Sequence, residues 1–402
     1  MQYNFLRKGE IIKTTPFEMV LIIRAAMKKC IVISDSFKGT LSTLDICAIA
    51  REVFPAYFPD CQLVTLPVAD GGEGTVACFL EAFRAQPVEV TVSGPFGEPV
   101  QAAYARKDAL AVIEMASAAG LPLAGERRDP ETATTYGVGQ LIHHAVEQGC
   151  TDILLGLGGS ATNDGGCGCA AALGTRFYDA EGHVFVPTGG TLANIAHIDT
   201  DESRRLLENV RVTVMCDVEN PLCGPNGAAW VFGPQKGADD AMAARLDDGL
   251  RHLDKILQQD LQVSLVDLPG AGAAGGMGAG SIAFLGGTLR SGIEAVLDAV
   301  DFNRQLDGAN LVITGEGRID AQSVQGKVIS GIAKRTAPRS IPLVAIVGGI
   351  GLGAEAAYGL GLTAMFSINR AAESFAESAP KSAENYRRTL SDLLRLIKAI
   401  EA

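Results

Sequence analysis

The side chains that could do chemistry in this chain gather in five glycine-rich stretches. Glycine permits positive φ angles and lets backbone approach a ligand closely, as phosphate-binding loops require. Each stretch follows a predicted strand or opens a predicted helix, and each holds an acid or a lysine. Together they predict a site for an anionic small molecule. They are "DSFKG" (35–39), "ADGGEGT" (69–75), "GLGGSATNDGG" (156–166), "CDVENP" with "FGPQKG" (216–221 and 232–237), and "ITGEGRID" (313–320).

The first stretch lies between the apolar run "CIVIS" and a helix predicted over 41–54. Backbone N–H groups and the positive end of a helix dipole suit a phosphate at such a junction. Ser36 and Lys38 would then contact phosphate oxygens. The alternative is a helix cap, because Ser42 and Asp45 have the spacing of a capping box. The octapeptide "DSFKGTLS" leaves both interpretations open.

The stretch "GLGGSATNDGG" combines a strand end, a glycine loop and the start of a small-residue helix. Its Asp164 could accept a hydroxyl proton or hold a metal ion, and the alternative is that Asp164 only caps the helix. A functional role is the favoured interpretation. The groups expected to bind substrate or nucleotide are Gly158, Gly159, Ser160 and Asn163, with Gly71 and Gly72 of "ADGGEGT".

Two familiar nucleotide motifs do not fit. The segment "PGAGAAGGMGAG" (269–280) contains GxGxxG, but Pro269 and a poor strand precede it, which disfavours a dinucleotide fold. It is expected to let a loop or helix pack closely against ligand or sheet. "VQGKVIS" lacks the upstream glycine and the Ser or Thr after Lys327 that a P-loop requires, and the protein-kinase signatures are missing. A phosphotransferase with this sequence must use another phosphate cradle.

Composition and charge narrow the class of protein. The 402 residues are 47% hydrophobic and 20% charged, which is typical of globular proteins, and the length favours two domains. The net charge of −12 argues against nucleic acid as the main partner. No apolar run reaches the length of about 18 residues that a membrane helix needs. The 9 scattered cysteines fit reduced thiols in the cytoplasm, and Cys167 and Cys169 are expected to pack rather than bind zinc.

The order of predicted elements indicates an α/β protein of two domains. Strands and helices alternate at both ends of the chain, as in a flavodoxin-like or Rossmann-like parallel sheet. Between about 88 and 114, three short strands indicate an antiparallel meander instead. The economical arrangement is a discontinuous parallel-sheet domain over 27–90 and 288–402, with a mixed α/β domain inserted over 91–287. Residues 1–26 are expected to be an extension outside the fold.

Open α/β sheets bind ligands at the carboxyl ends of their strands. The predicted strand ends at 34–38, 67–72 and 314–318 should therefore share one edge of the parallel sheet. Three of the five glycine-rich stretches begin there. We expect the ligand site at this edge, in a cleft beside the inserted domain.

The motifs resemble, in order and spacing, those of the bacterial type I glycerate kinases. The resemblance runs from about Lys28 to the C-terminus, and Ser34 departs from the Ala-Pro pair expected before Asp35. It implies ATP-dependent phosphorylation of D-glycerate, usually at the 2-hydroxyl to give 2-phosphoglycerate, with Mg²⁺ and an interdomain site. The motifs are "DSFKGTLS", "PVADGGEGT", "VSGPFGEPV", "IEMASAAGL", "GLGGSATNDGG", "CDVENPL", "FGPQKGA", "PGAGAAGGMGAG", "VITGEGRID" and "GKV".

Phosphoryl transfer needs charge neutralisation and in-line positioning more than covalent chemistry. Lys38, with Ser36 and the following helix start, is therefore expected at phosphate oxygens of ATP or of the transferred group. Lys236 or Arg318 would hold the glycerate carboxylate, and the alternative for each is a surface ion pair.

Four acids are candidates for the remaining roles. Asp70 and Asp164 are candidates for the base that accepts the glycerate hydroxyl proton, and Asp164 is favoured. Asp217 and Glu316 are the remaining candidate Mg²⁺ ligands, directly or through water. Each of the four could exchange roles with another.

Three alternatives to this function stay open. One is phosphorylation at the 3-hydroxyl, the second is a non-catalytic sugar-acid binding protein, and the third is an NAD-linked dehydrogenase. The expected partners are glycerate and ATP, without nucleic acid or membrane. The oligomeric state is undecided, with a homodimer as one option.

Overall fold

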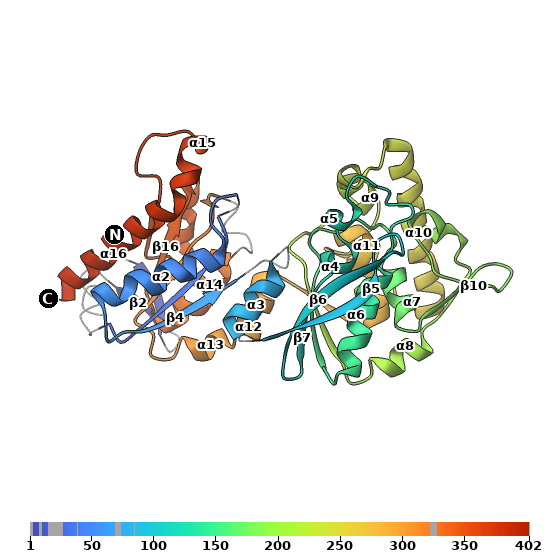
Figure 1. Ribbon diagram of the computed structural model, residues 1–402, viewed down its shortest axis with the longest axis horizontal. Coiled ribbons are helices and arrows are strands. Elements are labelled where there is room, and N and C mark those ends of the chain that lie inside the picture. Colours follow the sequence, from blue (N-terminus) through green and yellow to red (C-terminus); the bar gives the residue numbers. More distant parts are fainter. Residues whose placement is uncertain are drawn as a thin grey trace. The chain divides into compact units, whose positions relative to one another are not determined.

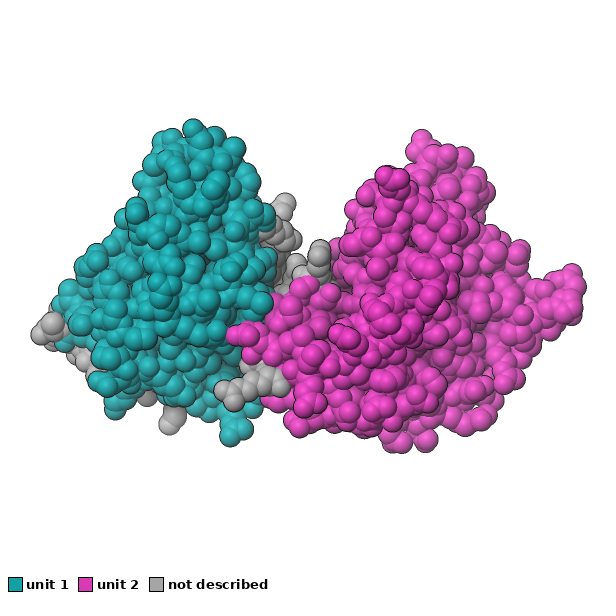
Figure 2. All heavy atoms as spheres, viewed as in Figure 1, with its two compact units in different colours: residues 1–70, 296–402 teal, residues 71–295 magenta. Residues whose placement is uncertain are grey.

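The computed structural model describes residues 3–7, 10–14, 27–37, 39–68, 74–83, 85–321 and 328–401. The chain divides into two compact units (Figures 1 and 2): unit 1 is Met1–Asp70 with Val296–Ala402, and unit 2 is Gly71–Ala295. Both units mix helices and strands, so the α/β class predicted from the sequence is confirmed.

Unit 1 is built on a parallel five-stranded sheet. Its strands, in spatial order, are β18 (Ala364–Ser367), β16 (Leu343–Val347), β14 (Leu311–Thr314), β3 (Lys29–Ser34) and β4 (Gln62–Pro67). Their apolar runs are nearly continuous because the central strands are buried on both faces. The chain runs from β3 outward to β4 and later from β14 outward to β18. The order therefore reverses between β3 and β14, and a ligand is expected at the carboxyl ends of these two strands.

Helices cover both faces of this sheet. Alternate residues of a strand point to opposite faces, and Cys30 and Val32 of β3 pack in one core with α2 (Thr43–Tyr57) and α16 (Ser382–Glu401). On the other side α14 (Val328–Thr336) contacts β14 and β16. The smaller elements are α13 (Phe302–Gln305), β15 (Arg318–Ile319), η3 (Ala337–Arg339), β17 (Gly349–Ile350), η4 (Ala354–Leu360), α15 (Phe375–Ser378) and η5 (Ala379–Lys381).

The predicted N-terminal extension contains a hairpin. Strands β1 (Tyr3–Arg7) and β2 (Glu10–Thr14) pair antiparallel, and β1 contacts η3. The other residues of 1–26 lie outside the described residues. The extension therefore contributes at least this contact to unit 1.

Unit 2 contains a mixed six-stranded sheet. In spatial order its strands are β13 (Thr288–Arg290), β12 (Arg211–Met215), β8 (Asp152–Gly156), β7 (Leu110–Glu114), β6 (Pro99–Lys107) and β5 (Gln86–Ser93). The first four are parallel, while β5, β6 and β7 form the antiparallel meander that the sequence predicts. Because β5 and β13 pair within this sheet, residues 71–90 and 288–295 belong to unit 2, whereas the sequence placed them in the end-built domain.

The helices of unit 2 pack around one large core. The longest is α10 (Asp240–Leu261), whose Leu246, Leu250, Leu253 and Leu257 are buried as a single stripe. The other elements are α3 (Thr75–Phe83), α4 (Ala116–Ala119), α5 (Leu121–Ala124), α6 (Tyr136–Glu147), α7 (Cys167–Ala172), β9 (Arg176–Tyr178), β10 (Val184–Phe185), η1 (Gly189–Asn194), β11 (His197–Asp199), α8 (Asp201–Leu206), α9 (Ala228–Phe232), η2 (Pro234–Lys236) and α11 (Ala273–Leu285). Helix α12 (Gly292–Ala299) leads back to unit 1.

Candidate active site

The loop between β3 and α2 ends in a complete capping box. The Ser42 hydroxyl accepts from the Asp45 N–H at 3.1 Å, and the Asp45 carboxylate accepts from the Ser42 N–H at 3.0 Å. Two N–H donors at the start of α2 are therefore already used, and the Asp45 charge lies beside them. The cap predicted from "DSFKGTLS" is confirmed. Lys38 lies outside the described residues, so its phosphate role stays a prediction.

The carboxyl ends of β3 and β14 are tied together at the reversal of strand order. The Asp35 N–H donates to the Gly315 carbonyl at 2.9 Å, and the Asp35 carboxylate accepts from the Ser36 N–H at 2.7 Å. A side chain on Gly315 would come within 2.0 Å of the Ile346 carbonyl oxygen, so this close approach requires glycine. Ser36 and Glu316 thus lie on loops, and Arg318 at the start of β15, at the edge where the sequence predicts them.

The two charged residues of "ITGEGRID" differ in exposure. Glu316 is only 6% exposed, and its carbonyl accepts from the Gly348 N–H at 3.1 Å. The Arg318 side chain is 71% exposed, with its Nε 3.7 Å from the Asp320 carboxylate. The ion pair foreseen as the alternative for Arg318 is therefore present. Its exposure leaves the guanidinium accessible to an anionic ligand.

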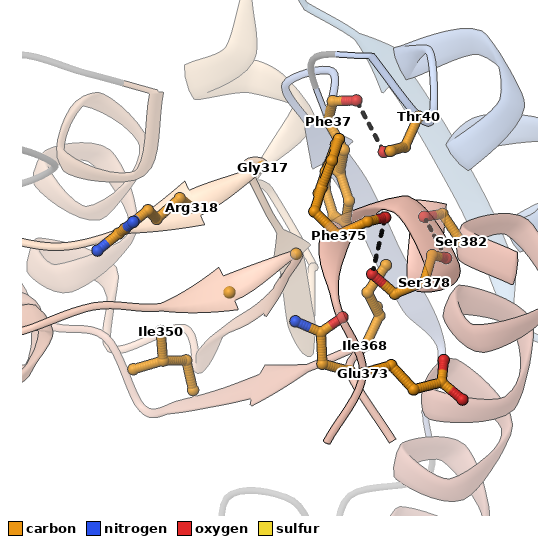
Figure 3. Close-up of a pocket in the computed structure, with 13 residues that line it drawn as sticks. Phe37, Thr40, Gly317, Arg318, Ile350, Ile368, Glu373, Phe375, Ser378 and Ser382 are labelled. Atoms are coloured by element: carbon orange, nitrogen blue, oxygen red, sulfur yellow. Dashed lines mark hydrogen bonds between the residues drawn. The ribbon is translucent and has the colours of Figure 1, made fainter. Parts of the chain in front are cut away.

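A cavity of about 430 Å³ lies beyond the carboxyl ends of the unit 1 strands (Figure 3). Gly317 and Arg318 follow β14, Gly348 follows β16, and Ile368 follows β18. The segment that includes Phe375, Ser378 and Ser382 lines the opposite side (Figure 3). The sequence predicted the edge, but it did not indicate the residues after 366, because no glycine-rich motif marks them.

In unit 2, Asp164 is completely buried, and both of its carboxylate oxygens accept hydrogen bonds. Its Oδ2 accepts from the Thr135 N–H at 2.7 Å, the Thr135 hydroxyl at 2.8 Å and the Gly168 N–H at 3.3 Å, while Oδ1 accepts from the Gly166 N–H at 3.1 Å. The Thr135 hydroxyl itself accepts from the Cys169 N–H, so its proton must point to Asp164. Burial raises the pKa of Asp164, and these four bonds oppose that rise. The contacts favour a carboxylate that holds the loop over one that accepts a substrate proton.

Lys236 is buried beside the same loop. It is 1% exposed, and its Nζ donates to the Ser160 hydroxyl at 2.9 Å and to the Thr162 carbonyl at 2.7 Å. An ammonium has three donor hydrogens, so one remains for a ligand when the group is charged. Burial lowers the pKa of Lys236 to about 7, while the Asp164 charge opposes this shift. The surface ion pair foreseen as its alternative is thereby excluded.

The low pKa of Lys236 predicts a pH-dependent stability. Between about pH 7 and 10.5 the folded protein loses the Lys236 proton while the unfolded chain keeps it. The unfolded state then binds more protons, so the stability of the wild type should rise with pH in this window. Relative to Lys236→Met, the free energy of unfolding should gain a few kcal/mol from pH 7 to 10. Denaturant unfolding at several pH values measures this. Lys255→Met, which removes an exposed lysine, is the control. If the difference in free energy of unfolding between the wild type and Lys236→Met did not change with pH, the low pKa of Lys236 would be contradicted.

Next to Lys236, two buried polar side chains make no hydrogen bond within the described part of the chain. Asn163 and Thr162 are both 0% exposed, and the two amide atoms of Asn163 and the hydroxyl of Thr162 have no partner there. Each such group costs about 1–3 kcal/mol when it is left unpaired. Most buried polar groups in native proteins are paired, so groups of this kind call for a specific partner, and a ligand is one such partner. With Gly158, Gly159 and Ser160 on the same loop, they form the core of the candidate site in unit 2.

The segment 269–280 holds this loop by close backbone packing. Gly275 has a φ of +70°, and a side chain there would come within 2.0 Å of the Thr162 carbonyl oxygen. A side chain on Gly280 would come within 2.3 Å of the Gly165 carbonyl oxygen. The glycines therefore serve helix-to-loop packing, in agreement with the prediction that this segment packs closely.

Asp217 and Glu316 remain the candidate Mg²⁺ ligands. Mg²⁺ usually takes one or two carboxylates and completes its shell with water and substrate phosphates. Exposed Asp217 follows β12, and its Oδ1 accepts from the Gly292 N–H at 2.9 Å, so it fits such a sparse site. Buried Glu316 fits a hydrated ion less well. In the ranges that the structure describes, no three His, Cys, Asp or Glu side chains cluster as a metal site.

The structure brings some of the predicted site residues together, and others lie outside the described residues. Gly158, Gly159, Ser160, Asn163, Asp164 and Lys236 meet in unit 2, and Ser36, Glu316 and Arg318 share an edge of unit 1. Lys38, Asp70, Gly71 and Gly72 lie outside the described residues. Thr135 was missed, because its contact with Asp164 spans 29 residues and no local pattern indicates it.

Two further expectations concern cysteines and membranes. All 9 cysteines lie in described ranges and none forms a disulfide; Cys167 and Cys169 are buried in α7, as expected for packing residues. Among the helices of the described ranges, none is both long and apolar enough to cross a bilayer.

Comparison with known proteins identifies the family. The model of the Glycerate kinase family matches residues 30–398. Glycerate kinase of Bacillus cereus is 43% identical over 373 residues, which are 92% of this chain and 98% of the relative. Glycerate 2-kinase of Escherichia coli K12 is 43% identical over 343 residues, 85% of this chain and 90% of the relative. A crystal structure described as a glycerate kinase 2 from Salmonella typhimurium LT2 has a TM-score of 0.83 at 41% identity and covers 92% of this chain and 98% of its own. This chain therefore belongs to the glycerate kinase family of enzymes.

Proposed function

We propose that the protein transfers the γ-phosphoryl group of ATP to the 2-hydroxyl of D-glycerate, giving 2-phosphoglycerate and ADP. Its 43% identity to the Escherichia coli glycerate 2-kinase supports the position of transfer. The observation that carries the substrate class is the buried amide of Asn163, which lies unpaired within the described residues next to Lys236. A short hydroxy acid has the carboxylate and hydroxyls that can pair these groups.

The glycerate carboxylate would take the remaining Lys236 hydrogen, and the Asn163 amide would bind its hydroxyls. A charged ammonium buried in an apolar surrounding interacts more strongly with an anion than one in water does. The Arg318 guanidinium is the alternative ligand for the carboxylate, and its exposure supports a role at a phosphate instead.

The remaining roles follow from the chemistry of phosphoryl transfer. Lys38 and Ser36 would neutralise and position phosphate oxygens, and Asp70 would accept the hydroxyl proton, because Asp164 already accepts four hydrogen bonds. Bound Mg²⁺, held by Asp217, would supply further neutralisation of the phosphate charge. The interdomain position of the site stays a prediction.

The assignment is tested by an ADP-release assay that contains D-glycerate, ATP and Mg²⁺. Glycerate-dependent ADP formation that stops when any of the three components is omitted is the expected result. Glycerate binding without ADP formation would indicate a sugar-acid binding protein. A glycerate-dependent change in nicotinamide absorbance would indicate a dehydrogenase.

The Asn163 amide offers a sharper test, in which stability and function change in opposite directions. Asn163→Leu keeps the number of side-chain heavy atoms and replaces the two unpaired amide groups by larger methyl groups. The free energy of unfolding should rise by about 1 kcal/mol, because the added volume offsets part of the gain. The same change should lower kcat/KM for glycerate by roughly 10²-fold, because the ligand's own polar groups would then be buried unpaired. Thr162→Val is the matched variant for the neighbouring hydroxyl. An Asn163→Leu protein with normal kcat/KM would show that the amide does not meet the substrate.

A further inference from the structure

The cavity of unit 1 has the position of a ligand site but no ligand assigned to it. It lies beyond the carboxyl ends of β14, β16 and β18, and Phe37 and Thr40 of the β3–α2 loop also line it. Its volume of about 430 Å³ lies within the usual range of small-molecule sites. The loop that carries Phe37 and Thr40 also carries Ser36 and Lys38, the residues expected at phosphate oxygens. A ligand in the cavity could therefore extend along this loop toward Ser36.

Apolar side chains supply one part of the lining. Phe375 is 69% exposed and Ile350 is 47% exposed, although both line the cavity. Ile368 and Phe37 also line it and are buried. Large apolar groups exposed around a concavity mark a surface that a partner or ligand covers. A flat aromatic ring between Phe375 and Ile350 would remove both from water.

The position of Phe375 is well defined despite its exposure. The Ser374 hydroxyl and the Glu377 carboxylate form a capping box at the start of α15. The Ser378 hydroxyl donates to the Phe375 carbonyl at 3.3 Å (Figure 3). Lys381 pairs with Glu373 at 2.9 Å. These local bonds fix the turn that presents the ring. The aromatic wall is thus built before a ligand arrives.

One polar group of the lining has the pattern that an adenine edge requires. Asn369 is exposed, its backbone N–H donates to the Ser367 hydroxyl, and its side-chain amide makes no hydrogen bond to the described residues. A carboxamide offers one acceptor and one donor side by side, which matches the amino group and ring nitrogen of adenine. On this edge, which carries N6 and N7 in adenine, guanine presents two acceptors, O6 and N7, and would mismatch the amide.

We propose that this cavity binds the adenosine part of ATP, with Phe375 and Ile350 covering the base and Asn369 selecting adenine over guanine. The assignment rests on the proposed kinase function, since it names the place of the nucleotide in that reaction. It adds a specificity-determining residue, Asn369, and an aromatic platform, Phe375. Both lie in a segment outside all the glycine-rich stretches.

Two variants and their matched controls test the proposal. Phe375→Ala should raise the KM for ATP and the Kd for ADP by about tenfold, with the KM for glycerate unchanged. Asn369→Arg replaces the amide by a group with donors only, which suits O6 and N7 of guanine, so the ratio of kcat/KM for ATP over GTP should fall by about tenfold or more. The controls are Tyr358→Ala and Asn303→Arg, which alter exposed side chains of unit 1 outside the cavity and should leave every constant unchanged.

Calorimetric titration with ADP separates this proposal from the kinase assignment. If the wild type lacks glycerate-dependent ADP formation, the proposed function fails, and weaker ADP binding by Phe375→Ala would still support the cavity. If the wild type is an active kinase, the proposal is overturned when both variants keep its ADP affinity and its ATP over GTP preference. A general loss of folding could explain weaker ADP binding by Phe375→Ala. It could not explain a shift of preference from ATP to GTP in the variant at Asn369.

Discussion

Asp70→Asn is expected to lower kcat by roughly 10²–10⁴ with little change in the KM for glycerate or in the melting temperature. The amide keeps the shape of the side chain, but it cannot accept the hydroxyl proton. Steady-state kinetics with glycerate varied, together with thermal unfolding, measure both quantities.

Asp164→Asn is the comparison that separates proton acceptance from loop positioning. An amide NH₂ in place of Oδ2 would face the N–H donors of Thr135 and Gly168. In place of Oδ1 it would face the N–H donor of Gly166. We therefore expect the free energy of unfolding to fall by about 1–3 kcal/mol, along with activity. The opposite pattern would identify Asp164 as the base, as the sequence favoured: normal stability and lost kcat in Asp164→Asn, with normal kinetics in Asp70→Asn.

Lys38→Ala is expected to lower kcat/KM for ATP by about 10²–10³-fold, with kcat and KM both affected. A lysine on phosphate oxygens contributes in the ground state and in the transition state, so both constants should change. Lys398→Ala, at an exposed position of α16, is the matched control and should behave as wild type. Normal kinetics in Lys38→Ala would leave "DSFKG" as a helix cap alone, and the phosphate cradle would then be sought in "GLGGSATNDGG".

Local patterns in the sequence predicted the elements and the cap of α2. The apolar run of β3 is recognisable because burial on both faces leaves a continuous run of apolar residues. The stripe on α10 is recognisable because burial of one helical face leaves a periodic pattern. The capping box is equally local, since Ser42 and Asp45 are three residues apart. The boundary between the units was less predictable. The pairing of β5 with β6 was predicted as part of the meander, but the place of α3 in unit 2 depends on its contacts with β6 and β7, which no local pattern indicates.

The candidate site was predictable as motifs but not as contacts. "GLGGSATNDGG" and "FGPQKG" were both chosen for their residue types, yet the bond from Lys236 to Ser160 spans 76 residues. No local rule could show that Lys236 is buried while Arg318 is exposed. No local rule could decide the role of Asp164 either, because its catalytic and capping interpretations differ only in the residues that contact its carboxylate. Asn369 and Phe375 have no motif at all, and only the folded sheet edge brings them to the cavity.

The most direct test of the proposed reaction is ³¹P NMR of the product formed from D-glycerate, ATP and Mg²⁺. The proposed reaction predicts one new phosphomonoester resonance, split by the single proton on carbon 2 and coincident with added 2-phosphoglycerate, growing as ATP is converted to ADP. A resonance coupled to two protons and coincident with added 3-phosphoglycerate would contradict transfer to the 2-hydroxyl, and conversion of ATP to ADP and free phosphate alone would contradict glycerate as the acceptor.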